Sequence, residues 1–228
     1  MTGLRVVIAT PHTRHDTLEK NIRELTGIEI LRVRAPFELD SSILADFNPR
    51  FIFFPHWSWK IPGNIFEKFE CLIFHMTDLP FGRGGSPLQN LIVRGICETQ
   101  LTALRCVADL DAGPIYMKRP LSLFGTAEEI LLRASKLTEE MIVCILHEQP
   151  TAQPQVGVPT NFSRRAPEDG DLAELAELEE VFDYIRMLDA EGYPRAFYET
   201  KNFKLELSRA SLKSDSIIAD VKISRRKS

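Results

Sequence analysis

A histidine, several glycines and two aspartates that could support proton-transfer chemistry lie within one stretch of about forty residues. His75 follows the apolar run 71–74, and Gly-Arg-Gly-Gly follows it at 82–85. Asp109 and Asp111 occupy a later turn. An imidazole beside a carboxylate can take up and return a proton, and glycine-rich backbone lets N–H groups approach a ligand. Taken singly, the same features are also typical of a strand end, a plain connection and an acidic turn.

A second candidate group follows the apolar run Phe51-Ile52-Phe53-Phe54 and reads Pro-His-Trp-Ser-Trp-Lys over 55–60. His56 and Lys60 could meet a ligand at the end of a strand. The alternative is an aromatic lid, with Trp57 and Trp59 packed on the core.

The elements that would position these residues alternate between strand and helix. Apolar runs predict strands at 4–9, 28–33, 51–55, 71–75 and 99–107, and helical periodicity or caps predict helices near 18–25, 41–47, 61–69, 86–94 and 126–148. This order predicts an α/β fold, a Rossmann-like and mainly parallel sheet with helices on both faces. Ligands of such sheets bind beyond the carboxyl ends of the strands, where His75 is expected. Thr10-Pro11-His12-Thr13 follows the first strand in place of a glycine-rich dinucleotide motif.

Composition changes along the chain predict three parts. Residues 1–148 are expected to form the catalytic domain, and the Pro-, Gln-, Gly- and Ser-containing stretch 149–170 a surface connector. Residues 171–228 are expected to form a small C-terminal α+β unit, with a helix over 171–190 and strands at 196–199, 203–207 and 217–223.

The overall composition excludes several classes of protein. The chain has 228 residues, 44% of them hydrophobic and 26% charged, and a formal net charge of −4. It is therefore expected to be a soluble cytoplasmic protein that has no membrane partner and no broad affinity for nucleic acid. The four cysteines never form C-x-x-C and are expected to be core residues, so no metal site is expected.

Several spaced motifs together resemble the folate-dependent formyltransferase family, and the methionyl-tRNA formyltransferases give the closest motif match. The family pattern runs N-x-H-P-S-L-L-P, R-G-x-x-P-I-Q, G-x-x-E-T-G-V-T and D-x-G. The chain supplies, in the same order, His75, Leu79-Pro80, Arg83-Gly84, Pro87-Leu88-Gln89, Gly95, Glu98-Thr99, Thr102 and Asp111-Ala112-Gly113.

The resemblance implies transfer of a formyl group from 10-formyltetrahydrofolate, as co-substrate, to a primary amine without a metal. By position it implies His75 as the acid/base group and Asp111 as its partner. It also suggests Leu79, Pro80, Asp109 and Gly113 at the folate, and Arg83, Gly84, Asn90 and Lys60 at the substrate.

One departure from the family pattern concerns the oxyanion that forms when the amine attacks. Ile73 stands where the family has an asparagine, and strand alternation points it to the same side as His75. Loss of such a donor costs on the order of 3 kcal/mol in a comparable enzyme. His56 is the predicted substitute and third catalytic residue, with Ser58 and Asn90 as further candidates.

The distribution of acidic residues bears on which amine accepts the formyl group. About ten acidic residues and one arginine lie between Glu168 and Glu191, which disfavours tRNA as a partner. The sequence-based preference is therefore a small-molecule amine, that of a nucleotide-linked amino sugar. Methionyl-tRNA formyltransferase, formyltetrahydrofolate hydrolase and a non-catalytic folate or nucleotide binding protein are the alternatives, and a homodimer is left open.

Overall fold

The computed structural model describes residues 3–226, which cluster into two compact units. The first unit contains the chain up to Gly84, then Thr99–Leu121 and Leu132–Asn161. The second unit contains Gly85–Glu98, Ser122–Leu131 and the chain from Phe162 onward. Residues 227 and 228, at the end of the predicted C-terminal unit, lie outside the described part. The predicted boundaries at 148 and 170 stay a prediction.

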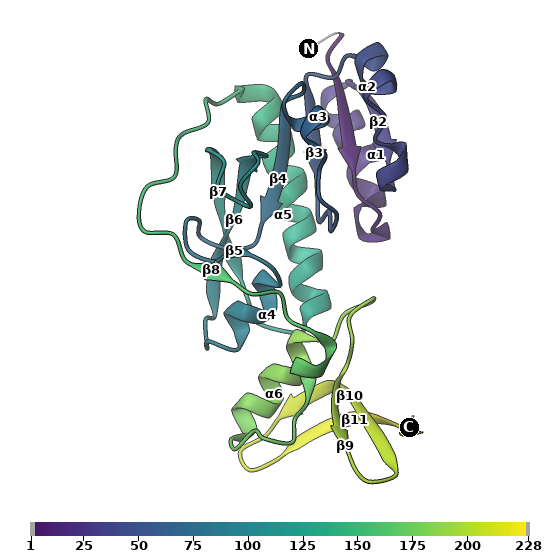
Figure 1. The fold of residues 1–228 in the computed structure, drawn as a ribbon, viewed down its shortest axis with the longest axis vertical. Helices are drawn as coiled ribbons and strands as arrows, with labels where there is room; N and C mark the ends of the chain where they lie inside the picture. The colour runs from purple at the N-terminus through teal and green to yellow at the C-terminus, as the bar shows by residue number, and fades with distance from the viewer. Residues whose placement is uncertain (1–2, 227–228) are drawn as a thin grey trace. The chain divides into compact units, whose positions relative to one another are not determined.

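A six-stranded sheet with the order β2-β1-β3-β4-β6-β7 is the centre of the first unit (Figure 1). β1 pairs in parallel with β2 and β3, β3 pairs in parallel with β4, and β6 runs antiparallel to β4. The strands are β1 (Arg5–Ala9), β2 (Glu29–Val33), β3 (Phe51–Phe54), β4 (Cys71–His75), β6 (Glu98–Arg105) and β7 (Ile115–Ser122). The predicted Rossmann-like, mainly parallel sheet is confirmed.

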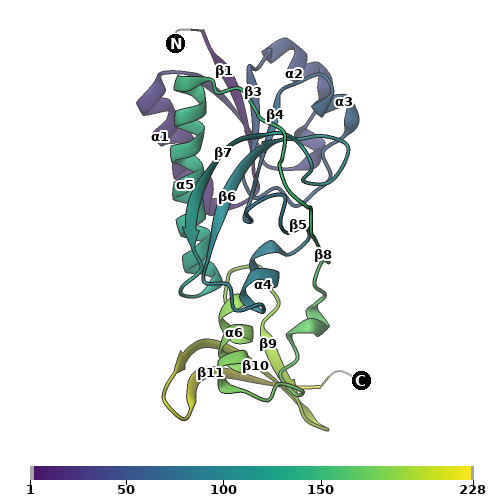
Figure 2. The ribbon, with the colours of Figure 1, turned by 90° about the vertical axis from the view of Figure 1, so that its left-hand side faces the viewer.

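Helices cover both faces of this sheet. α1 (Asp16–Thr26) and α5 (Ala127–Glu148) lie on one face, and α2 (Ser41–Phe47) and α3 (Gly63–Phe66) on the other (Figure 2). The central strands are apolar on both sides because both faces are covered, and all four residues of β3 are buried. Short 3-10 turns, η1 (Thr13–His15) and η2 (Pro36–Glu38), precede α1 and α2.

α3 and β7, in the first unit, differ most from the sequence-based expectation. α3 has four residues, whereas a helix over 61–69 was predicted. β7 was not predicted at all, because it includes Lys118, Arg119 and Pro120 and only one of its eight residues is buried. An edge strand of this kind lacks the apolar run by which a strand is recognised in sequence.

The second unit combines helices with a three-stranded antiparallel sheet, ordered β11-β10-β9. It contains α4 (Pro87–Ile92), η3 (Pro167–Gly170), α6 (Leu178–Met187), β9 (Ala196–Glu199), β10 (Phe203–Leu212) and β11 (Ile217–Arg225). α6 starts later than the predicted residue 171, because the Glu180 carboxylate accepts the backbone N–H groups of Ala176 and Glu177 and fixes the start there. β10 continues past the predicted residue 207 through an irregularity between Ser208 and Ser211.

Between residues 3 and 226, no helix is both long and apolar enough to cross a membrane. Within the same range, no group of three or more His, Cys, Asp or Glu side chains has an arrangement that could hold a metal ion.

Candidate functional site

β4 places His75 at the carboxyl edge of the sheet. The strand's apolar residues bury it between β3 and β6, and in the register with β6 His75 lies opposite Thr102. His75 is 8% exposed and Asp111 7% exposed. The two residues predicted to act together meet, with 3.6 Å between His75 Nδ1 and Asp111 Oδ2.

The turn after β4 fixes the imidazole. The Gly82 carbonyl oxygen lies 2.8 Å from His75 Nε2 and also accepts the Thr77 hydroxyl at 3.3 Å. The Thr102 hydroxyl in turn donates to the Thr77 carbonyl at 2.7 Å. A carbonyl can only accept a hydrogen bond, so Nε2 carries the hydrogen. Nδ1, which faces Asp111, is then the nitrogen that can gain and lose a proton.

Asp111 lies beyond the end of β6 in a left-handed backbone conformation, with φ of 52°. Its Oδ2 atom accepts the backbone N–H of Gly84 at 2.9 Å. Gly84 has φ of 107°, which a side chain would strain. The glycine-rich stretch therefore approaches the Asp111 carboxylate through its backbone, and its predicted approach to a ligand stays a prediction.

Gly113 closes the turn against the sheet. A Cβ atom at this position would lie 1.9 Å from the Arg105 carbonyl oxygen. The adjacent Pro114 carbonyl accepts the Arg105 N–H at 2.9 Å. Only glycine therefore fits where the turn returns to the strand, which gives Gly113 a structural role whether or not it also contacts folate.

The other predicted folate residues lie on the two turns that flank the pair. Leu79 is buried and its carbonyl accepts Lys118 Nζ at 2.6 Å, whereas Asp109 is exposed. Pro80 is half-buried and its carbonyl accepts the Thr160 N–H at 3.2 Å. Their contact with folate stays a prediction.

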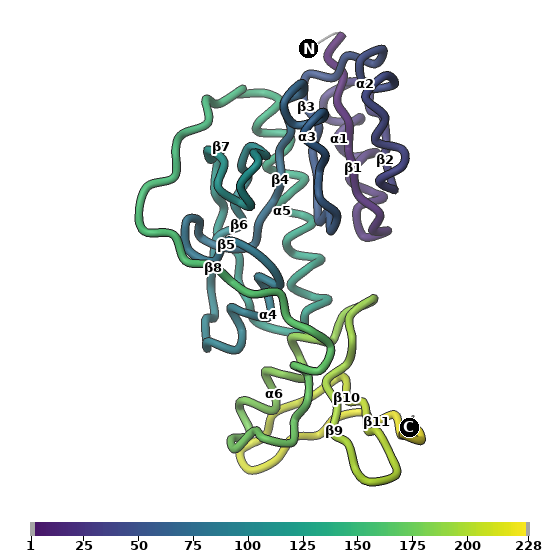
Figure 3. The backbone as a smooth tube through the Cα atoms, in the orientation of Figure 1, coloured from purple at the N-terminus to yellow at the C-terminus, as the bar shows by residue number. Residues whose placement is uncertain are grey.

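Residues 153–160, named here the strap, belong to the outer loop that runs from the end of α5 to β8 (Figure 3). The strap is hydrogen-bonded to the turn after β4. Gln153 exchanges two backbone hydrogen bonds with Ile115 at 2.7 and 2.9 Å. Thr160 accepts the N–H of Gly82 on its hydroxyl at 3.1 Å and the N–H of Arg83 on its carbonyl at 2.9 Å. The short strands β5 (Arg83–Gly84) and β8 (Asn161–Phe162) continue this pairing.

The predicted substrate-binding side chains are dispersed. The Arg83 guanidinium donates to Gln155 Oε1 through Nε at 3.1 Å and Nη2 at 2.7 Å. Lys60 is exposed between β3 and α3. Asn90, in the second unit, donates to the carbonyls of Gly85, Ser86 and Ser163. Their substrate roles stay predictions.

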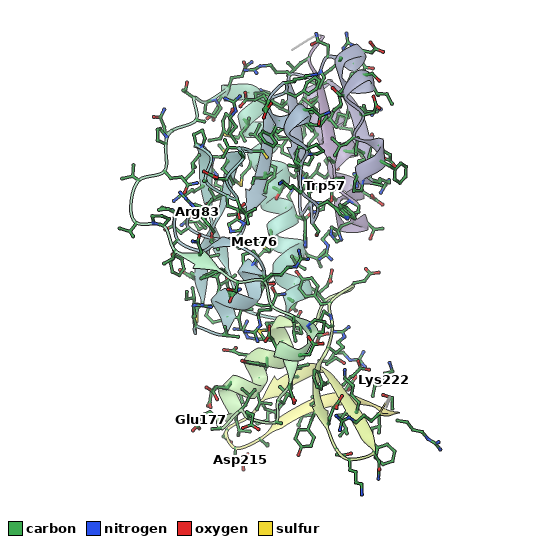
Figure 4. The ribbon with its side chains drawn as sticks, viewed as in Figure 1. Trp57, Met76, Arg83, Glu177, Asp215 and Lys222 are labelled. Carbon is green, nitrogen blue, oxygen red and sulfur yellow. The ribbon has the colours of Figure 1, made fainter. Side chains whose placement is uncertain are left out.

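His56 lies at the end of β3, the strand beside β4, with φ of 49°. Its ring centroid is 4.3 Å from that of His12, and burial lowers the pKa of His56 to about 3, which keeps the ring neutral. Trp57 packs edge-on against Phe54 and on the core, as the lid alternative expects, whereas Trp59 is 44% exposed and contacts Trp57. Figure 4 labels Trp57. It also labels Met76 and Arg83, which lie on either side of the turn 77–82 that follows His75.

Ile73 is half-buried and packs against the apolar cluster on one face of the sheet. It pairs with Phe54 of β3 and Leu104 of β6. The position therefore supplies an apolar contact and no amide donor. Whether His56 replaces that donor stays a prediction.

Two cavities of about 320 and 520 Å³ lie at the opposite edge of the sheet, where β1, β3 and β4 begin. They share Arg50 and Glu70, and the first also contains Arg105 and Tyr116. Glu70 pairs with Arg105 at 3.3 Å and accepts the Tyr116 hydroxyl. Neither cavity is lined by His75 or Asp111.

Sequence reasoning missed the groups that hold the pair. Thr77, Gln155 and Thr160 lie in turns or in the connector, where no periodicity marks them. Thr102 was recognised only as part of a motif. The D-x-G spacing predicted the turn at 111–113 but not the strap residues that bind it.

Comparison with known proteins extends over the whole chain. Residues 167–224 match the family profile described as methionyl-tRNA formyltransferase, C-terminal domain. A solved structure titled methionyl-tRNA formyltransferase from Clostridium thermocellum is 46% identical, with a TM-score of 0.94, and the alignment covers 98% of this chain and 100% of that one. A sugar N-formyltransferase from Shewanella sp. FDAARGOS_354 is 12% identical with a TM-score of 0.72, covering 93% and 99%, and shows the fold alone.

Among curated proteins, methionyl-tRNA formyltransferase of Rickettsia rickettsii (strain Iowa) is 33% identical over 110 residues, which make up 45% of this chain and 36% of that protein. The chain thus spans about a third of the length of the curated relatives it matches. The Clostridium thermocellum structure, by contrast, is matched over its full length. With the motifs around His75 and Asp111 and the fold that brings them together, this match shows that the chain belongs to the folate-dependent formyltransferase family.

Proposed function

We propose that the chain transfers a formyl group from 10-formyltetrahydrofolate to a primary amine, with His75 and Asp111 moving the proton. The observation that carries this proposal is the buried imidazole–carboxylate pair, 3.6 Å apart at the carboxyl edge of the sheet, in a chain of this family. The folate contacts of Leu79, Pro80, Asp109 and Gly113 are part of the same proposal.

The reaction needs one proton to change place. The amine lone pair attacks the formyl carbon, and the C=O double bond becomes a C–O⁻ single bond. The nitrogen, now positively charged, gives its proton to His75 Nδ1, and the resulting imidazolium is stabilised by Asp111 Oδ2. The intermediate collapses by breaking the bond to N10 of the folate, and N10 takes the proton. The products are a formamide and tetrahydrofolate.

The acceptor we favour is the amino group of methionyl-tRNA, and no longer the amino sugar that was preferred on sequence grounds. Its support is the name carried by the 46% identical structure and by the curated relatives. The sequence argument against tRNA rested on the acidic stretch 168–191. A later stretch has the opposite balance: residues 203–226, from the start of β10 to the residue after β11, contain six basic residues and three acidic ones.

An amino sugar remains the second candidate, on a specific observation. The stretch 168–191 carries ten acidic residues and one arginine, and this charge repels the many phosphates of a tRNA more than the single diphosphate of a nucleotide-linked sugar. For an amino-sugar acceptor, Arg83 and Lys60 are the predicted substrate residues whose positive charges suit the diphosphate of the nucleotide.

The test is a formylation assay with 10-formyltetrahydrofolate and two acceptors, charged initiator methionyl-tRNA and a panel of nucleotide-linked amino sugars. We expect formyl-methionyl-tRNA as product, with a KM for tRNA that rises steeply with salt. Product only from an amino sugar, with little salt dependence, would replace the favoured acceptor. The His75→Gln variant is the control for uncatalysed transfer.

Two outcomes would overturn transferase activity itself. Formate release without formylated product would indicate a hydrolase. Tight folate binding without either product would indicate a binding protein. The assembly state, including a homodimer, stays a prediction that sedimentation can test alongside.

A further inference from the structure

We propose that Gln155 is a positioning residue for the proposed transfer: from the strap, it holds the turn that carries Asp111. This inference rests on the proposed function for its kinetic consequence. Gln155 Nε2 donates to the carbonyl oxygens of Asp111 at 2.8 Å and Gly113 at 2.9 Å. Its Oε1 accepts both hydrogen bonds from Arg83.

The side-chain amide is fully used and has one workable orientation. An amide NH₂ group has two hydrogens, and each binds one carbonyl of the turn. The amide oxygen faces the two N–H groups of the Arg83 fork. Rotating the amide by 180° would place NH₂ against the guanidinium and oxygen against two carbonyls, so the partners fix its direction.

The turn needs such support because the first part of it, before the buried Asp111, is exposed and weakly hydrogen-bonded. Asp111 has φ of 52°, a conformation that costs a non-glycine residue about 1 kcal/mol or more. Leu110 is 70% exposed and Asp109 is exposed, so neither anchors the turn in the core. The hydrogen bond from Ala112 N–H to Asp109 O is 3.3 Å long.

Gln155 also joins the two sides that meet at the carboxylate. It donates to the backbone carbonyl of Asp111 directly. It also accepts hydrogen bonds from the side chain of Arg83, and the next residue, Gly84, donates its N–H to Asp111 Oδ2. A displacement of either side would change the 3.6 Å separation between the carboxylate and His75. A misplacement of about 1 Å in a catalytic group can cost about 100-fold in rate.

The strap can transmit this restraint because it is anchored on both sides of Gln155. Gln153 pairs with Ile115 of β7, and Thr160 binds the 80–83 turn through its N–H, carbonyl and hydroxyl. Supporting groups of this kind orient a catalytic residue without touching the substrate.

The first experiment compares Gln155→Leu and Gln155→Glu with the same changes at Gln153, whose side chain is exposed. We expect both Gln155 variants to lower kcat about 10- to 100-fold while KM for the folate and the amine changes less than about 3-fold. The Glu variant keeps an acceptor for Arg83 but places anionic oxygen against two carbonyls, so it should not rescue kcat. The Gln153 variants should match wild type. Wild-type kcat in Gln155→Glu would overturn the proposal.

A double-mutant cycle identifies the route of the effect. If Gln155 acts through Asp111, Gln155→Leu adds no further loss of kcat in an Asp111→Asn background. A loss that multiplies with that of Asp111→Asn would mean that Gln155 acts elsewhere, and would overturn the proposal.

Hydrogen exchange separates this inference from the proposed function. In Gln155→Leu we expect the amide of Ala112 to exchange at least about 10-fold faster, and the same amide in Gln153→Leu to be unchanged. This measurement needs no substrate. If the wild type transfers no formyl group, the proposed function fails while exchange still decides whether Gln155 holds the turn. Unchanged exchange at Ala112 would refute that role.

Discussion

Gly84 donates its backbone N–H to Asp111 Oδ2 at 2.9 Å, and the same oxygen faces His75 Nδ1 at 3.6 Å. One carboxylate oxygen thus has a fixed donor on one side and the imidazole on the other. The donor belongs to a glycine with φ of 107°, so the backbone of the glycine-rich turn sets the position of the charge.

Asp111→Asn should lower kcat by about 100-fold or more, because it removes the charge that stabilises the imidazolium. Asparagine tolerates the left-handed φ of 52° at this position, so the melting temperature should change little. Steady-state formylation and thermal unfolding measure the two effects. Asp46→Asn, at an exposed position of α2 away from the predicted site, is the control and should keep full activity. Full activity in Asp111→Asn would contradict the assignment.

His75→Gln should lower kcat by about 100-fold or more, since glutamine cannot accept and return a proton near neutral pH. Glutamine can still donate toward the Gly82 carbonyl, so the turn should persist. Folate affinity, measured by calorimetry, should stay within about 3-fold of wild type. A parallel loss of folate affinity would show that His75 binds the folate and does not only move a proton.

Gly113→Ala should destabilise the fold by several kcal/mol, because a Cβ atom would lie 1.9 Å from the Arg105 carbonyl oxygen. Urea unfolding gives the free energy. Gly63→Ala is the matched control: its Cβ would meet the flexible Glu67 side chain at 3.3 Å and the Phe66 ring at an ordinary contact distance of 3.8 Å. Equal stability of the two variants would be inconsistent with this close approach.

Stability should fall in acid because of His15. Burial lowers the pKa of His15 from 6.5 to about 3, and neighbouring charges contribute. The groups that lower it further are His12, Arg14 and Arg32, whereas Asp16 raises it. The folded pKa is below the unfolded one, so the unfolded chain binds the proton more tightly. The stabilisation is complete above about pH 6.5 and is lost as pH falls toward 3, by up to about 1.4 kcal/mol per pH unit.

The check is urea unfolding of wild type and His15→Gln between pH 6 and pH 4. The slope of the unfolding free energy against pH should be smaller in the variant. The difference corresponds to at most one proton taken up on unfolding, or about 1.4 kcal/mol per pH unit. His147→Gln, at an exposed position near the end of α5, should keep the wild-type slope. An identical slope in His15→Gln would mean that His15 does not remain neutral.

His56→Asn should lower kcat by 10- to 100-fold if His56 supplies the oxyanion donor absent at Ile73. Asparagine suits its φ of 49°, so the backbone should be retained. Stopped assays at saturating substrate measure the loss. Unchanged kcat would leave His56 as a residue of the aromatic lid, packed beside His12.

The parallel sheet could be predicted from sequence because its central strands are buried on both faces and read as continuous apolar runs. The pairing of His75 with Asp111 was implied by the motifs that resemble the family, because a strand-end histidine and an acidic turn alone are equally typical of ordinary structural positions. β7 could not, since an edge strand with Lys118, Arg119 and Pro120 has no apolar signature.

The support of the pair was equally invisible. Gln155 and Thr160 bind distant backbone carbonyls and N–H groups, and hydrogen bonds of this kind leave no local pattern in a Pro- and Gln-containing connector. Arg83 was predicted at the substrate from its residue type; its guanidinium donates to Gln155, a partner that its type did not indicate, and its contact with a substrate stays a prediction. Residue type indicates what a side chain can bind, but the fold decides which partner it meets.

The anchoring of the strap also has a consequence for biosynthesis. Ribosomes synthesise the chain from its amino terminus, so His75 and Asp111 leave the ribosome before Gln155 and Thr160. Until Gln155 and Thr160 have been synthesised, the nascent chain contains His75 and Asp111 but lacks the strap that holds them at their separation. Catalytic activity should therefore appear late in translation. A fragment that ends before the strap should still form the six-stranded sheet but should have no transferase activity.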